Sequence, residues 1–86
     1  MKNYTSEEIK NKMIEFFQYQ VDDLKRCYKN PYICEDFSKA KLLDYNIQQM
    51  LAVSFFCQKF DIEYEEIDKL YTEYREKLDN LYKEYT

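Results

Sequence analysis

The sequence of 86 residues contains no glycine and no histidine, and it has a single proline, Pro31. Glycine most readily adopts the left-handed backbone conformations of tight hairpins, so its absence favours an all-helical fold. It also excludes glycine-rich phosphate loops and nucleophile elbows. Without histidine, the chain lacks the commonest general base and metal ligand. We therefore expect a protein with no enzymatic activity, no cofactor and no metal.

Arginine and cysteine are also scarce. Only Arg26 and Arg75 are arginines among 13 basic residues, which face 17 acidic ones and leave a net charge of −4. Proteins that grip phosphates usually carry an arginine-containing basic patch, so direct nucleic-acid binding is not expected. The cysteines Cys27, Cys34 and Cys57 show no paired spacing, which indicates reduced thiols in a cytoplasmic protein.

Long apolar segments are absent too. The only nearly unbroken apolar run extends from Met50 to Cys57 and is closed by Phe60. This is far shorter than the roughly 20 residues that a membrane-spanning helix needs. The polar N-terminus does not resemble a signal peptide. We expect no membrane association.

The first helix is predicted over residues 6–29. Thr5 and Glu8 have the spacing of a capping box, and apolar residues follow at steps of three and four. Pro31 ends this helix because proline cannot continue it. We expect the apolar residues after the proline, Tyr32, Ile33 and Cys34, to fold over the end of the helices. A recognition loop is the alternative.

Two more helices are predicted, over residues 36–60 and 63–85. Asp36 or Ser38 is the expected cap of the second, and a seven-residue apolar rhythm runs through both. The sequence therefore predicts one domain, residues 1–86, with an all-α fold. Short connections favour an antiparallel, up-down-up three-helix bundle with coiled-coil-like packing. A rival arrangement exchanges the first helix between two subunits.

The second helix has more apolar surface than two neighbouring helices can cover. Between Met50 and Cys57 no wide polar face remains, which is typical of a buried helix. One flank is expected to be left over, which predicts a homodimer or a partner-binding surface. Tyrosines on the third helix also suit an interface, where one end of the ring is buried and the other is wet. The apolar and aromatic candidates for such an interface are Leu51, Phe55, Phe56, Phe60, Tyr71, Tyr74, Tyr82 and Tyr85.

Acidic residues gather at the start of the third helix. Residues 61–86 carry nine acidic and four basic residues, whereas residues 1–60 carry eight acidic and nine basic. Negative charge suits a helix N-terminus, which explains part of this cluster. The remainder is a candidate surface for a basic partner. The candidate acidic contact residues are Asp61, Glu63, Glu65, Glu66 and Asp68.

These features favour a small interaction protein that acts by contact alone. One hypothesis is a phage or mobile-element inhibitor, of the kind represented by anti-CRISPR proteins, that blocks a larger and basic nucleic-acid-processing enzyme. An alternative is a dimeric DNA-binding accessory or regulatory protein that uses the lysines near residues 25–41. A further alternative is an immunity-type protein that shields its own cell from a toxin.

Overall fold

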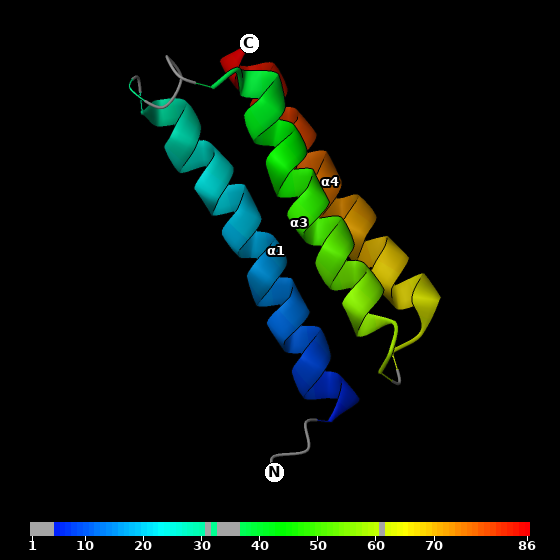
Figure 1. The fold of residues 1–86 in the computed structure, drawn as a ribbon. Coiled ribbons are helices and arrows are strands. Elements are labelled where there is room, and N and C mark those ends of the chain that lie inside the picture. The colour runs from blue at the N-terminus through cyan, green and yellow to red at the C-terminus, as the bar shows by residue number, and fades with distance from the viewer. Residues whose placement is uncertain (1–4, 31, 33–36, 61) are drawn as a thin grey trace.

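The structure, a computed structural model, describes residues 5–30, 32, 37–60 and 62–86. Within these ranges the chain forms three helices that pack against one another, with no strand (Figure 1). They are α1 (Ser6–Lys29), α3 (Lys39–Cys57) and α4 (Tyr64–Tyr85). The all-α prediction is confirmed.

Local signals in the sequence account for both ends of α1. The Glu8 amide donates to the Thr5 hydroxyl at 3.1 Å, and the Thr5 amide donates to the Glu8 carboxylate at 3.4 Å, so the predicted capping box is present. At the other end the Asn30 amide bonds to the Cys27 carbonyl, and Asn30 itself is extended. This geometry is expected for a residue that precedes proline.

The helix α3 is shorter than predicted at both ends. Of the two expected caps, Ser38 accepts a hydrogen bond from the Lys41 amide at 3.1 Å, and Asp36 lies outside the described residues. The helix ends at Cys57 rather than near residue 60, because the backbone tightens there into a turn. The Phe60 amide bonds to the Cys57 carbonyl at 3.1 Å, and the chain then turns back so that Ile62 is buried.

The prediction that the segment after Pro31 folds over the bundle is wrong for Tyr32. Its side chain is 77% exposed. The Tyr32 amide bonds to the Asn30 side chain at 3.0 Å, which holds the backbone locally without burying the ring. Ile33 and Cys34 lie outside the described residues.

One apolar core runs along the three helices. Phe17 and Leu24 from α1, Met50 from α3 and Leu78 from α4 are completely buried. The ring of Phe17 lies 5.8 Å from that of Tyr74. The buried apolar residues are Met13, Phe17, Leu24, Tyr28, Ile47, Met50, Cys57, Ile62, Ile67, Tyr74, Leu78 and Leu81.

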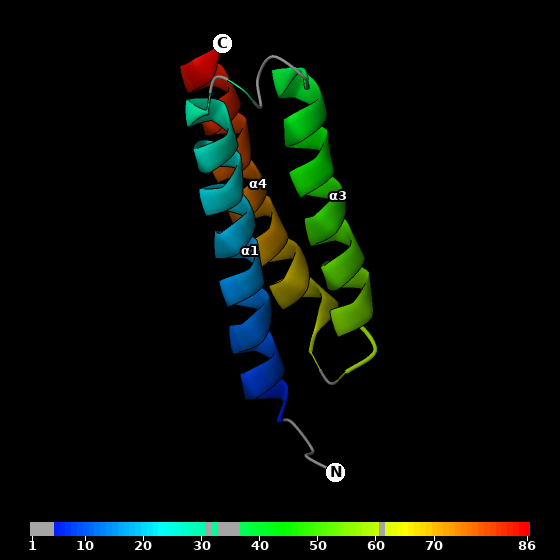
Figure 2. The same ribbon diagram turned by 60° about the vertical axis from the view of Figure 1, so that its left-hand side comes forward.

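Side-chain contacts fasten the helices together at one end of the molecule. The Tyr28 hydroxyl donates to the Lys39 carbonyl at 2.7 Å, and the Lys39 ammonium donates to the Tyr85 carbonyl. The rings of Tyr28 and Tyr85 lie 5.5 Å apart. We call these three residues the latch. Figures 1 and 2 show the end of α1, the start of α3 and the end of α4 together at this end.

A single ion pair links α1 to α4 near the opposite end, among the residues that the structure describes. The ammonium of Lys10 lies 3.0 Å from the Glu66 carboxylate. This contact raises the pKa of Lys10, chiefly through the hydrogen bond. Exposed pairs of this kind contribute little to stability.

Candidate protein-interaction surfaces

The Met50–Cys57 stretch forms the C-terminal half of α3 and divides its side chains three ways. Met50, Ser54 and Cys57 face the core. The Ser54 hydroxyl donates to the Met50 carbonyl at 2.8 Å, which satisfies it inside the bundle. Burial raises the pKa of the Cys57 thiol. A thiol with a raised pKa is a poor nucleophile, so Cys57 behaves as a core residue.

Phe55 and Phe56, the two residues between Ser54 and Cys57, are not buried. Phe55 is 63% exposed and Phe56 is 59% exposed. Successive residues of a helix are separated by about 100° around its axis, so the two rings lie on different sides of α3. The burial expected on all sides of α3 is therefore incomplete. Each ring borders its own hollow.

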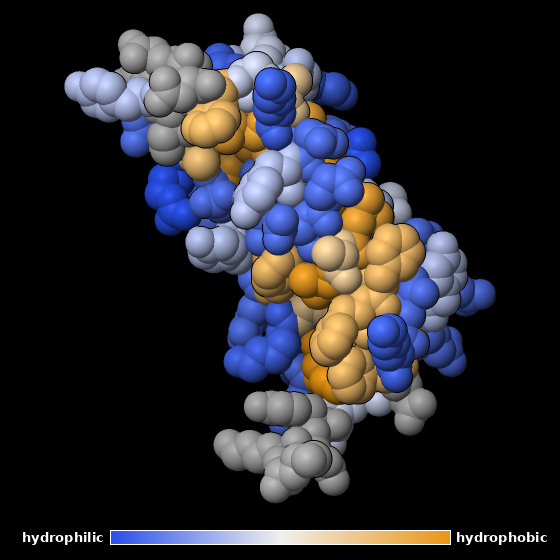
Figure 3. Space-filling view, in the orientation of Figure 1, coloured by the Kyte–Doolittle hydropathy of each residue, from blue (hydrophilic) through white to orange (hydrophobic). Residues whose placement is uncertain are grey.

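Phe56 borders a large hollow between α1 and α3, which we call the α1/α3 groove. Its volume is about 540 Å³. The Phe60 ring packs edge-on against Phe56, with ring centres 5.3 Å apart. Figure 3 shows an apolar patch over the lower part of these two helices. The lining residues are Ile9, Lys12, Met13, Phe16, Val53, Phe56, Cys57 and Phe60.

Phe55 borders a smaller hollow of about 130 Å³ between α3 and α4, which we call the acidic hollow. Most of its lining residues are apolar or aromatic, and its one charged lining residue is Asp68, which makes no ion pair with any described residue. Tyr64 is largely exposed at its edge. The lining residues are Leu51, Ser54, Phe55, Gln58, Tyr64, Ile67, Asp68 and Tyr71.

The predicted acidic residues do not all lie on one side of α4. Asp68 lines the acidic hollow, whereas Glu66 extends toward α1 and pairs with Lys10. Glu63 caps α4 without a side-chain hydrogen bond, and Glu65 is exposed in the first turn. Asp61 lies outside the described residues. Of the four predicted acidic residues that the structure describes, Asp68 lines a hollow and Glu66 pairs with Lys10.

The tyrosines of α4 hold different positions. Tyr74 is buried against Phe17, and Tyr85 belongs to the latch. Tyr82 is half-buried at the edge of the core. Tyr71 lines the acidic hollow, and its hydroxyl accepts a hydrogen bond from Arg75 at 3.2 Å. That bond is the main reason why the pKa of Arg75 is raised.

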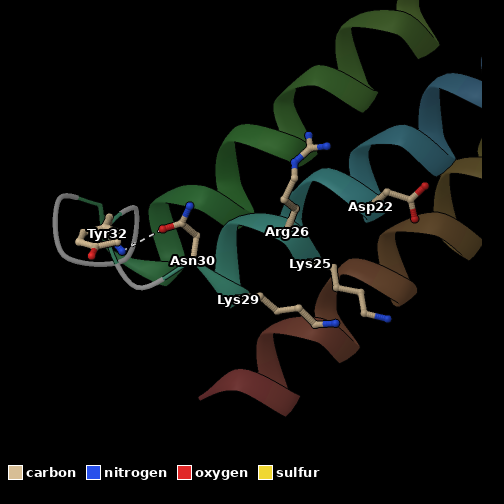
Figure 4. A pocket seen from close by; sticks show the side chains of 6 residues that line it. All are labelled: Asp22, Lys25, Arg26, Lys29, Asn30 and Tyr32. Carbon is tan, nitrogen blue, oxygen red and sulfur yellow. Dashed lines mark hydrogen bonds between the residues drawn. The ribbon is translucent and has the colours of Figure 1, made fainter.

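The basic residues at the end of α1 surround an open hollow of about 650 Å³ (Figure 4). Lys25 and Lys29 extend to one side of it, and Arg26 extends to the other. Arg26 is already engaged, because its guanidinium lies 2.7 Å from the Asp23 carboxylate. This hydrogen bond raises the pKa of Arg26. The cations therefore do not converge on one point.

Sequence reasoning did not single out two buried amides. Gln20 is 4% exposed and Asn46 is 2% exposed. The Asn46 amide donates to the Gln20 carbonyl oxygen at 2.8 Å and to the Asp23 carboxylate at 3.3 Å. The burial of Gln20 was indicated by its position in the sequence, because it lies three residues after Phe17, in step with the apolar spacing of α1. We call Gln20 and Asn46 the buried amide pair.

Comparison with known proteins finds no matching family, no matching characterised protein and no matching solved structure. The described part of the chain has no group of three or more cysteine, aspartate or glutamate residues placed to hold a metal ion. None of its helices is long and apolar enough to cross a membrane.

Proposed function

We propose that this protein acts by contact alone, as a homodimer that binds a basic, amphipathic segment of a larger protein in the acidic hollow. The carrying observation is that the exposed ring of Phe55 lines the same hollow as the carboxylate of Asp68, which makes no ion pair with any described residue. An apolar anchor beside a complementary charge is the arrangement that protein interfaces use for affinity and orientation.

The charge around the acidic hollow selects the chemistry of its occupant. Asp68 lines it, Glu65 is exposed in the preceding turn, and residues 61–86 carry an excess of five negative charges. A helix that presents leucine-like side chains on one face and lysine or arginine beside them would satisfy both features. An acidic segment would meet like charges.

The larger partner that we propose is a nucleic-acid-processing enzyme, whose own substrate site is basic. Occupying such a site would inhibit the enzyme without any chemistry. Anti-CRISPR-like inhibitors, which phages and mobile elements carry, represent this kind of protein. An immunity-type protein that binds a toxin would use the same surface. In either case the protein has no catalytic role.

The arrangement of the helices belongs to the same proposal. We infer an up-down-up bundle with coiled-coil-like packing, in which each helix packs against its own chain. The latch at one end and the Lys10–Glu66 pair near the other support this arrangement. It leaves both hollows open on the outside of α3.

A designed peptide tests the acidic hollow directly. We would measure the binding of a fluorescent amphipathic helix of leucine and lysine by anisotropy, with a leucine–glutamate peptide of the same length as its charge control. Phe55→Ala and Asp68→Lys should each weaken binding of the lysine peptide about tenfold or more, a typical effect for an interface anchor. Binding should also weaken as salt rises.

Two matched variants serve as controls. Phe56→Ala removes an equally exposed ring from the other side of α3. Glu73→Lys reverses a carboxylate five residues after Asp68, about 140° away around the helix. Both should bind the lysine peptide like the wild type. Equal losses in all four variants, or equal affinity for the glutamate peptide, would overturn the proposed site.

A second candidate function is DNA binding by a dimer. The observation that favours it is the pair Lys25 and Lys29, which extend to the same side of the open hollow at the end of α1 (Figure 4). Filter binding of duplex DNA should then show an affinity that falls steeply with salt and is lost in Lys25→Glu and Lys29→Glu. Absence of any salt-dependent affinity would eliminate this function.

A further inference from the structure

We infer that the α1/α3 groove is the surface on which a second copy of this chain docks, related to the first by a two-fold axis. The inference rests on the homodimeric state proposed above and assigns it a location. It is independent of the basic segment proposed for the acidic hollow, because Phe55 and Phe56 border different hollows.

The groove is apolar over a large volume. Seven of the eight residues that line its 540 Å³ are apolar or aromatic, and only Lys12 carries a charge. Phe56 and Phe60 both line it, and their exposed rings have centres 5.3 Å apart. Exposed aromatic rings of this kind supply much of the affinity of protein interfaces.

Charge favours a second copy at the groove and disfavours it at the acidic hollow. At the groove, Lys12 is accompanied by Glu15 at 3.4 Å, and both side chains are exposed. A two-fold axis near this pair would place the Lys12 of each copy beside the Glu15 of the other. At the acidic hollow the same operation would oppose Asp68 to Asp68, and like charges across an interface are unfavourable.

The two-fold arrangement also makes the surface self-complementary. Each copy offers two exposed rings, Phe56 and Phe60, and further apolar lining residues, among them Ile9 and Phe16. In an isologous contact the Phe56 and Phe60 rings of each copy pack into the groove of the other, and the assembly closes at two subunits. No second patch is needed.

Sedimentation equilibrium of the full chain at micromolar concentration tests the inference. The wild type should have about twice the mass of 10.7 kDa. Phe56→Glu should be a monomer, because a carboxylate in the apolar groove opposes docking. Phe55→Glu is the matched control, equally exposed and adjacent, and should remain a dimer. Circular dichroism should show unchanged helix content in both variants.

A charge exchange provides a second, milder perturbation. Lys12→Glu alone should raise the dimer dissociation constant about fivefold, as expected for two exposed ion pairs. Adding Glu15→Lys should restore it, because the pairs are rebuilt with reversed signs. This double variant leaves the apolar groove intact.

The outcomes separate this inference from the proposed function. A dimer that persists in Phe56→Glu, or one lost only in Phe55→Glu, would overturn the assignment of the groove and leave the homodimer standing. A wild type that sediments as a monomer would overturn both the homodimer and the groove. Binding of the lysine peptide is measured separately and is unaffected by either result.

Discussion

The buried amide pair offers the sharpest test of how the three helices are held together. Asn46 and Gln20 are almost completely buried and share a hydrogen bond of 2.8 Å. Replacing Asn46 with leucine keeps its approximate shape but leaves the Gln20 carbonyl oxygen without its donor. An unsatisfied buried polar group costs about 1–3 kcal/mol. Asn46→Leu should therefore lower the free energy of unfolding by about 2 kcal/mol.

Replacing both amides should reverse that loss. In Gln20→Met/Asn46→Leu no unpaired amide remains, and removal of both partners of a buried hydrogen bond is nearly neutral or stabilising. Asp23 loses a bond of 3.3 Å but keeps its contact with Arg26. The double-mutant cycle should give a coupling energy of about 1–3 kcal/mol.

Urea unfolding followed by far-ultraviolet circular dichroism measures these differences. For a domain of this size the free energy of unfolding falls by about 1 kcal/mol per molar urea, so the midpoint of Asn46→Leu should drop by about 2 M. Gln18→Met is the control, because it removes a hydrogen bond of 3.1 Å to Asp22 at a less buried position of α1. It should cost less than about 0.5 kcal/mol. A double variant that loses the sum of the single losses would refute the reasoning.

Three further predictions concern single residues. Thr5→Ala removes the side-chain cap of α1 and should lower stability by about 0.5–2 kcal/mol in urea unfolding, with no loss in Thr5→Ser. Leu78→Ala empties a completely buried position of α4 and should cost about 2–5 kcal/mol, seen as a lower thermal midpoint. Burial raises the pKa of Cys57, so its thiolate forms at higher pH in the folded chain than in the unfolded one. Iodoacetamide should therefore modify Cys57 more slowly in native protein than in urea, as read by mass spectrometry of the peptide; equal rates would contradict its burial. Because the thiol pKa of Cys57 is higher in the folded chain, any stability that this thiol contributes is fully present below its pKa in the unfolded chain. That stability is lost as pH rises through its pKa in the folded chain.

Local signals in the sequence predicted the helices better than the surfaces. The capping box and Pro31 mark the ends of α1 because they act within a few residues of where they stand. The end of α3 was placed too late, since Phe60 continues an apolar rhythm after the backbone has already turned. The local sequence of that turn does not indicate that Ile62 is buried in the core.

The surfaces depend on contacts between distant residues, which periodicity alone does not supply. The helical spacing of Phe55 and Phe56 indicated that they lie on different flanks of α3. It did not indicate that Asp68 would border the same hollow as Phe55, or that Glu66 would instead reach Lys10. The buried amide pair was missed because each amide resembles an ordinary surface residue until its partner is known.

The latch has a consequence for how the groove deforms. Tyr28, Lys39 and Tyr85 tie one end of all three helices through backbone carbonyls, so no helix is able to slide along its neighbours without breaking a bond there. Phe56 lies toward the opposite end of α3. If the groove widens, the helices therefore move apart at the Phe56 end while the latch holds them together at the other end. Amide hydrogen exchange should accordingly be slower in the first turns of α3 that follow Lys39 than around Phe56.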